Sequence, residues 1–77
     1  MNILIEDAEK LEYLTTDGQW SKNATDGKSF AATETAFEIA KQERVGKFNI
    51  VCYIKQTRQF INLNHGRGKA VDATTTG

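Results

Sequence analysis

Residues 48–55 (FNIVCYIK) alternate strictly between two sets of side chains, and this pattern restricts the chain to folds that contain a two-faced β-sheet. The expected core face carries Phe48, Ile50, Cys52 and Ile54. The opposite face carries Asn49, Val51, Tyr53 and Lys55. Such alternation is typical of a strand with one face packed on a core, so the rest of the chain must supply that core.

Shorter segments predict the other strands. Residues 2–5 are expected to form the first strand, and residues 59–63 are expected to pair back on the 48–55 strand after a polar connection at 56–58. Residues 10–15 and 19–21 flank Asp17-Gly18, which predicts a hairpin with a type I′ turn, because that turn needs positive φ at both central residues. Residues 23–27 are expected to be a polar loop.

One segment predicts a helix that begins near Thr33. Thr33 is the expected N-cap, with Glu34 in the first turn, while Thr35 with Glu38 also fits a capping box and leaves the start open by two residues. Gly46 is expected at the left-handed position that ends many helices. The apolar stripe that would face the sheet consists of Ala36, Phe37 and Ala40, with Ile39 beside it.

These elements predict an α+β fold of order β-β-β-α-β-β, with one helix packed on one face of an antiparallel sheet. The expected domain spans residues 1–64, and the glycine-rich segment 65–77 is expected to be a flexible tail. Besides the core face of 48–55, the predicted core holds Leu14, Phe30 and the helix stripe. One helix cannot cover both faces, so Val51 and Tyr53, with Tyr13 or Trp20, are expected on an exposed surface.

Part of this layout resembles a known arrangement. Tyr13 to Trp20 (YLTTDGQW), followed by Ser29-Phe30, by Ala36 and Ala40 and by the strand at Phe48, resembles small uncharacterised bacterial and phage proteins. In those proteins a "yLt-dG-xW" hairpin precedes an alanine-spaced helix. The resemblance covers about residues 10–54. It implies the same hairpin–helix–strand fold and no activity, and it assigns no functional residue.

The inventory of reactive side chains argues against catalysis and against a cofactor. Cys52 lies on the predicted core face, and His65 lies in the predicted tail, so a Cys–His nucleophile pair is not expected. One cysteine and one histidine are too few for a zinc site, and no EF-hand spacing occurs. Gly68-Lys69 lacks the first glycine of a phosphate-binding loop. We therefore expect no enzyme activity, no catalytic residue, no metal and no small-molecule substrate.

The formal charges are divided between the two halves of the chain. Residues 1–45 carry nine acids and five bases, a net charge of −4, and residues 46–77 carry five bases and one acid, a net charge of +4. Charge asymmetry of this kind indicates an electrostatic partner. We expect protein binding or a homodimer through the open sheet face or edge, with a candidate surface that comprises Trp20, Tyr53, Lys55, Arg58 and Phe60. Trp20 has two interpretations, an inward core plug, which we favour, or an exposed anchor.

The alternative partner is nucleic acid at the basic C-terminal hairpin and tail. Its candidate contacts are Lys55, Arg58, His65, Arg67 and Lys69, with aromatic rings for base stacking. The sequence pI of about 6.6 falls below the basic value expected of such domains, which is why this function comes second. Apolar runs are too short to span a bilayer, and residues 1–10 do not match a secretory signal, so we expect no membrane partner and a cytoplasmic location.

Overall fold

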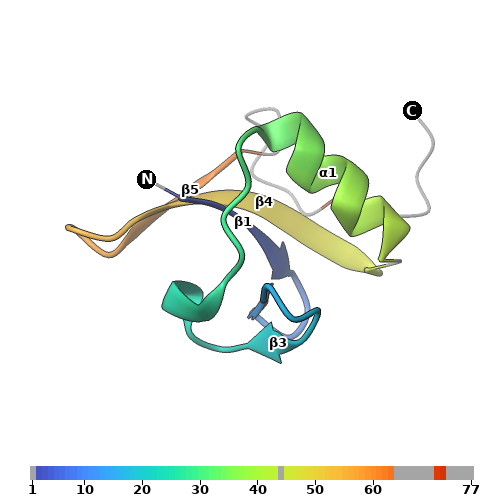
Figure 1. Ribbon diagram of the computed structural model, residues 1–77, viewed down its shortest axis with the longest axis horizontal. Helices are drawn as coiled ribbons and strands as arrows, with labels where there is room; N and C mark the ends of the chain where they lie inside the picture. Colours follow the sequence, from blue (N-terminus) through green and yellow to red (C-terminus); the bar gives the residue numbers. More distant parts are fainter. Residues whose placement is uncertain (1, 44, 64–70, 73–77) are drawn as a thin grey trace.

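The computed structural model describes residues 2–43, 45–63 and 71–72, which form one antiparallel sheet and a packed helix (Figure 1). The sheet order is β3-β2-β1-β4-β5, and β6 pairs with the start of β4. The predicted α+β fold and its order β-β-β-α-β-β are confirmed. In chain order the elements are β1 (Asn2–Asp7), β2 (Glu12–Leu14), β3 (Trp20–Ser21), η1 (Ala24–Asp26), α1 (Thr33–Gln42), β4 (Lys47–Ile54), β5 (Gln59–Asn62) and β6 (Val71–Asp72).

The centre of the sheet is the long pairing between β1 and β4. Ile5 lies opposite Ile50, and Leu4 lies opposite Val51. Residues directly opposite each other in an antiparallel pair share a face, so the alternation of β4 is repeated in β1. Ile5 and Ile50 belong to one buried cluster and Leu4 and Val51 to another, which means that the sheet has two apolar faces.

Helix α1 covers the first of these faces. Its small buried residues Ala36 and Ala40 let the helix approach the sheet closely, and the Phe37 ring meets Phe48 edge-on at 5.5 Å between centroids. The cluster also contains Ile5, Leu14, Phe30, Val45 and Ile50. Of the predicted core residues, Phe37 and Ile54 are half-buried rather than buried.

Both predicted ends of the helix are wrong in detail. Ala32 occupies the N-cap position without a side-chain cap, and Thr33 is already the first helical residue. The helix ends at Gln42, and Gly46 is not among the described residues with positive φ. Instead, the N–H of Val45 donates to the carbonyl of Ala40 at 3.3 Å, and Val45 is buried in the core below the helix. Burial of Val45, rather than a glycine cap, accompanies the end of the helix.

The second sheet face is not exposed to solvent, contrary to the prediction. Leu4, Tyr13, Val51 and Tyr53 are buried there, with Val51 at 4% and both tyrosines at 7% of full exposure. The segment that carries β3 and η1 curls under this face (Figure 1), and Ala24 of η1 packs on the cluster. The prediction failed because it counted the helix as the sole cover and left out the connection between β3 and α1.

Two kinds of turn join the strands. In the β2–β3 hairpin, Gly18 alone has positive φ, at 79°, and the N–H of Gly18 donates to Thr15. This is a three-residue loop with glycine in the left-handed position, so the type I′ prediction is wrong. The β1–β2 and β4–β5 loops each have four residues and end in a non-glycine residue at φ 55°, which is Leu11 in the first and Arg58 in the second.

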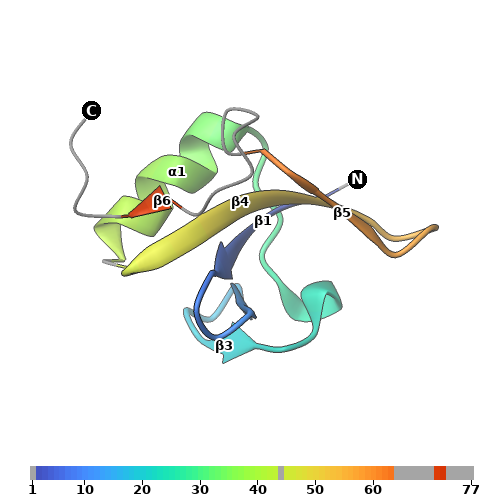
Figure 2. The same ribbon diagram turned by 180° about the vertical axis from the view of Figure 1, so that it is seen from behind.

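The segment predicted to be a flexible tail lies outside the described residues except for β6. Val71 lies opposite Phe48 and Asp72 opposite Lys47, so the sheet extends past the expected domain boundary at residue 64 (Figure 2). Residues 71 and 72 of the segment predicted to be a flexible tail therefore pair with β4.

Candidate interaction surface at strand β5

Strand β5 is an edge of the sheet that exposes two large apolar side chains. Phe60 is 46% exposed and Ile61 is 48% exposed. Phe60 pairs with Tyr53, and Ile61 pairs with Cys52, so the two side chains lie on opposite faces. Phe60 belongs to the predicted interaction surface, whereas Ile61 does not.

On the second sheet face, Phe60 caps an aromatic stack. Its ring centroid lies 4.8 Å from that of Tyr53 and 5.6 Å from that of Tyr13, and both pairs are stacked. The three rings come from three strands, with Tyr13 on β2, Tyr53 on β4 and Phe60 on β5. Both tyrosines are buried, so Phe60 is the ring of this stack that meets solvent.

A polar network borders this stack. Tyr13 Oη donates to Glu6 Oε2 at 3.0 Å, and Asn49 Nδ2 donates to Glu6 Oε1 at 3.0 Å. Asn62 Nδ2 donates in turn to Asn49 Oδ1 at 3.3 Å, which connects β5 to β1 through β4. Burial, followed by the negative charge and hydrogen bond of Glu6, raises the pKa of Tyr13 to about 12. The phenol therefore stays protonated as a donor to Glu6 at neutral pH.

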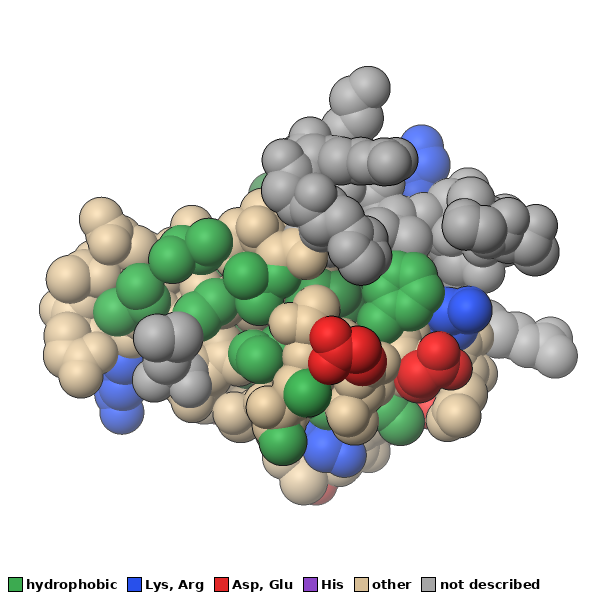
Figure 3. All heavy atoms as spheres, turned by 90° about the horizontal axis from the view of Figure 1, so that it is seen from above, with side chains coloured by type: hydrophobic (Ala, Val, Ile, Leu, Met, Phe, Trp, Pro, Cys, Tyr) green, Lys and Arg blue, Asp and Glu red, His purple; other side chains and the backbone are tan. Residues whose placement is uncertain are grey.

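On the helix side, Ile61 continues an apolar strip across the sheet. The register places Ile3, Cys52 and Ile61 side by side on β1, β4 and β5. Ile3 and Ile54 are half-buried on this face, and Ile3 packs against the core cluster. Figure 3 shows hydrophobic side chains gathered in a strip on this side of the molecule, with acidic side chains beside it.

The backbone of β5 also presents hydrogen-bonding groups at the edge. The N–H of Leu63 donates to the carbonyl of Ile50 at 2.7 Å, which marks these two residues as a hydrogen-bonded pair with β4. Such pairs alternate along an antiparallel ladder, so Ile61 bonds to β4 and Phe60 does not. The N–H and C=O of Phe60 point outward, where an added strand would meet them.

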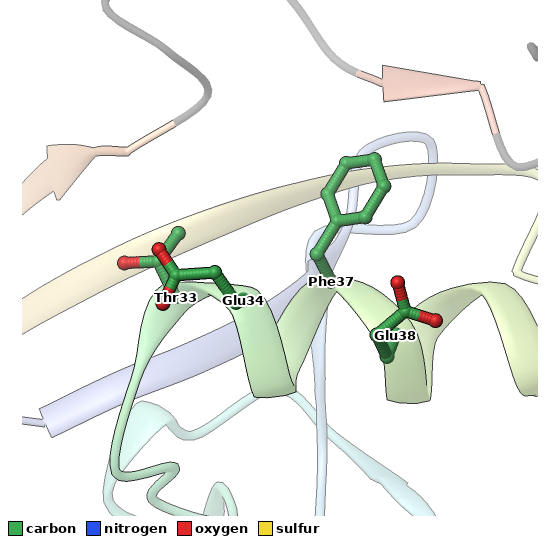
Figure 4. Close-up of a pocket in the computed structure, with 4 residues that line it drawn as sticks. All are labelled: Thr33, Glu34, Phe37 and Glu38. Atoms are coloured by element: carbon green, nitrogen blue, oxygen red, sulfur yellow. The ribbon is translucent and has the colours of Figure 1, made fainter. Parts of the chain in front are cut away.

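A hollow lies on helix α1. It has a volume of about 150 Å³ and is lined by Thr33, Glu34, Phe37 and Glu38. Figure 4 shows the Phe37 ring standing between the two glutamates, with Thr33 at the start of the helix. Lys41 Nζ lies 5.4 Å from the Phe37 ring centroid. Phe37 contacts the core residue Phe48, so this hollow lies on the solvent side of a side chain that packs on the core.

The predicted surface residues differ in how far the structure exposes them to solvent. Lys55 and Arg58 are exposed in the loop at the tip of the β4–β5 hairpin, next to Phe60. Tyr53 is buried beneath Phe60, so the prediction of an exposed Tyr53 is wrong. Trp20 is half-buried and packs on the helix-side cluster, in agreement with the favoured inward interpretation. Predicted nucleic-acid contacts outside the described residues are His65, Arg67 and Lys69.

Among the described residues, no group of three or more His, Cys, Asp or Glu side chains could hold a metal ion. Cys52 is buried as a free thiol. No helix in the described part of the chain has the length and apolarity required to cross a membrane.

Comparison with known proteins adds no relative. Neither protein-family models nor curated proteins nor solved structures gave a match to this chain. The class that the fold defines is a small α+β domain with an antiparallel sheet, and the resemblance to small bacterial and phage proteins stays a prediction.

Proposed function

We propose that this protein is a non-enzymatic binding module that docks a protein partner by strand addition at β5. The observation that carries the proposal is the exposure of Phe60 and Ile61 on opposite faces of one edge strand. Natural sheets usually protect an edge with a charged side chain, a proline, a bulge or a very short strand. The β5 sequence QFIN has no charge and no proline, and its register with β4 is regular over four pairs.

Strand addition combines backbone hydrogen bonds with side-chain contacts on both sheet faces. The outward N–H and C=O of Phe60 would supply the first, and the Phe60 ring and Ile61 would supply the second. Phe60 rests on two buried tyrosines, so its ring is held before a partner arrives. A preformed contact loses little conformational entropy on binding.

The proposal is tested by selecting linear peptides from a randomised display library on the immobilised full chain. We expect selected peptides to perturb the amide NMR signals of residues 59–62 and to bind at least about tenfold more weakly to Ile61→Lys. The matched control is Leu11→Lys, which changes an exposed leucine at the β1–β2 loop in the same way and should bind like the wild type.

Two outcomes would contradict the proposal. Peptides whose signals map to other elements would remove β5 as the docking site. Salt-sensitive binding of single-stranded oligonucleotides at the hairpin tip, lost in Lys55→Glu, with no peptide binding at β5, would favour nucleic acid as the partner.

A further inference from the structure

We infer that the strand added at β5 is β5 of a second copy of this chain, paired antiparallel about a two-fold axis at Phe60. The inference rests on the proposed function, because it names the partner of the same edge. A two-fold dimer joins the same surface of both subunits, so the edge must be complementary to itself. The backbone direction, the side chains and the charges of the described residues each meet this condition.

The backbone direction limits the possible pairing registers. A two-fold axis perpendicular to the sheet places the same face of both copies on the same side. Residues directly opposite each other share a face, so Phe60 must lie opposite an even-numbered residue of β5. When Phe60 lies opposite Phe60 of the second copy, the two residues exchange both of their outward hydrogen bonds. The same register places Ile61 opposite Gln59 of the second copy.

The side chains of β5 favour this pairing. Both Phe60 rings would lie on the second sheet face, where each already stacks on Tyr53, so the pairing would join two aromatic stacks into one. Aromatic pairs directly across two strands stabilise antiparallel pairing. Both Ile61 side chains would lie on the helix side and would join the two apolar strips. No charged residue lies within Gln59–Asn62, so the strands would meet without repulsion between like charges.

The charges outside β5 are complementary between the two copies. Antiparallel pairing places the hairpin tip of one copy, with exposed Lys55 and Arg58, beside the Leu63 end of β5 in the other. Leu63, which follows β5, and Phe37 of α1 both pack against the helix-side cluster, so this end of β5 and α1 lie on the same face of the sheet. Glu34 and Glu38 flank Phe37 on α1 and are exposed (Figure 4). The basic tip of each copy would therefore approach the acidic helix side of the other.

The first test is sedimentation velocity of the full chain from micromolar to millimolar concentration. The wild type should shift from monomer to dimer, and Ile61→Lys should weaken the dimer at least about tenfold. Leu11→Lys should change the dissociation constant by less than about twofold. A wild type that stays monomeric at millimolar concentration, or an equal loss in Leu11→Lys, would overturn the inference.

The second test follows amide hydrogen exchange by NMR as the concentration rises. The Phe60 amide should gain protection with dimer formation, whereas the Ile61 amide should be protected at all concentrations because it already bonds to β4. Protection that appears on other elements, with an unchanged Phe60 amide, would show a dimer with a different interface.

The third test exchanges the charges. Lys55→Glu/Arg58→Glu and Glu34→Lys/Glu38→Lys should each dimerise about threefold or more weakly than the wild type, because like charges then meet at both symmetric contacts. An equimolar mixture of the two variants should recover wild-type affinity, because opposite charges then meet at both contacts. A mixture no tighter than either variant alone would overturn the proposed arrangement.

These experiments separate the two proposals. A monomer that still binds selected peptides at residues 59–62 would refute only the dimer. A dimer formed elsewhere, together with no peptide binding at β5, would refute both the dimer at this edge and the proposed function.

Discussion

The two edges of the sheet differ in length, in cover and in what they expose. Strand β3 has two residues, and both of them are half-buried. Trp20 packs on the helix-side core, and Ser21 Oγ donates to Asp26 Oδ2 of η1 at 2.8 Å. Strand β5 has four residues, and three of them are exposed. A short, covered edge is protected against further pairing, whereas a longer edge with exposed apolar residues is open to it.

The difference indicates that the two edges have different roles. The apolar side chain of β3, Trp20, stabilises the monomer, because it adds to the core that the helix covers. At β5, Phe60 and Ile61 keep about half of their surface in contact with solvent. A domain of 77 residues has little apolar surface to spare, so leaving two large side chains exposed at one strand is a notable cost unless a partner covers them.

The largest expected effect on stability comes from shortening the Trp20 side chain at the covered edge. Trp20→Ala should lower the free energy of unfolding by about 2–4 kcal/mol, somewhat less than a fully buried tryptophan, because Trp20 is half-buried. Ile61→Ala should lower it by less than about 1 kcal/mol when measured as a monomer. Urea unfolding at low protein concentration, followed by circular dichroism, measures both values. Equal losses in the two variants would contradict the division of roles.

An intermediate effect is expected from the ring that caps the open edge. Phe60→Ala should cost about 1–2 kcal/mol, because two stacked ring pairs are lost while little fully buried surface is exposed. The variant should also lower the pKa of Tyr13 from about 12 towards 10, since removal of Phe60 lets water approach the phenol.

The control for this prediction is Phe60→Leu, which keeps an apolar cover over the tyrosines. Titration of carbon-13 labelled tyrosine side chains by NMR distinguishes Tyr13 from Tyr53. If the Tyr13 pKa is unchanged in Phe60→Ala, Phe60 does not shield this phenol.

The fold could be predicted from the sequence, but the cover on the second face of the sheet could not. The alternation of residues 48–55 and the apolar run at 2–5 located the two central strands, and small residues at helical spacing located the helix. Tyr53 was assigned to solvent because periodicity shows that two faces exist without showing what covers them. The cover comes from Ala24 and from Phe60, which lie 29 residues before and seven residues after Tyr53, and such contacts depend on tertiary structure.

The candidate site was predicted only in part for a related reason. Phe60, Lys55 and Arg58 were selected from their residue types, and all three lie at the exposed hairpin. Ile61 was missed because an isoleucine in a strand is ordinarily a core residue. Its exposure follows from the position of β5 at the edge and from the helix covering another part of this face, which are properties of strand order and packing.

A further prediction concerns pH. The Tyr13 phenol donates to Glu6, and Glu6 is linked through Asn49 to Asn62 of the open edge strand β5. The pKa of Tyr13 is raised in the folded state, so the unfolded chain releases this proton near pH 10 while the folded protein holds it until about pH 12. Unfolding is therefore favoured progressively as the pH rises through this range. Thermal unfolding at several pH values should show the decline, and Tyr13→Phe should lack this part of it.

The smallest expected effect lies in the turn that leads into β5. Arg58 has φ 55°, a left-handed conformation that is costly for a side chain with a Cβ atom. Arg58→Gly should relieve this strain and stabilise the monomer by up to about 1 kcal/mol, because the gain exceeds the added entropy of the unfolded chain. Leu11→Gly is the matched variant, since Leu11 has the same φ in the four-residue β1–β2 loop.

Both glycine variants should raise the unfolding midpoint by similar amounts, yet they should differ in binding. Arg58→Gly removes a basic group from the tip beside β5, so it should weaken dimerisation slightly while the monomer becomes more stable. Leu11→Gly should leave dimerisation unchanged. Weaker dimerisation in both variants would show that association depends on hairpin stability in general. Unchanged dimerisation in both variants would show that Arg58 is not part of the interface at the open edge.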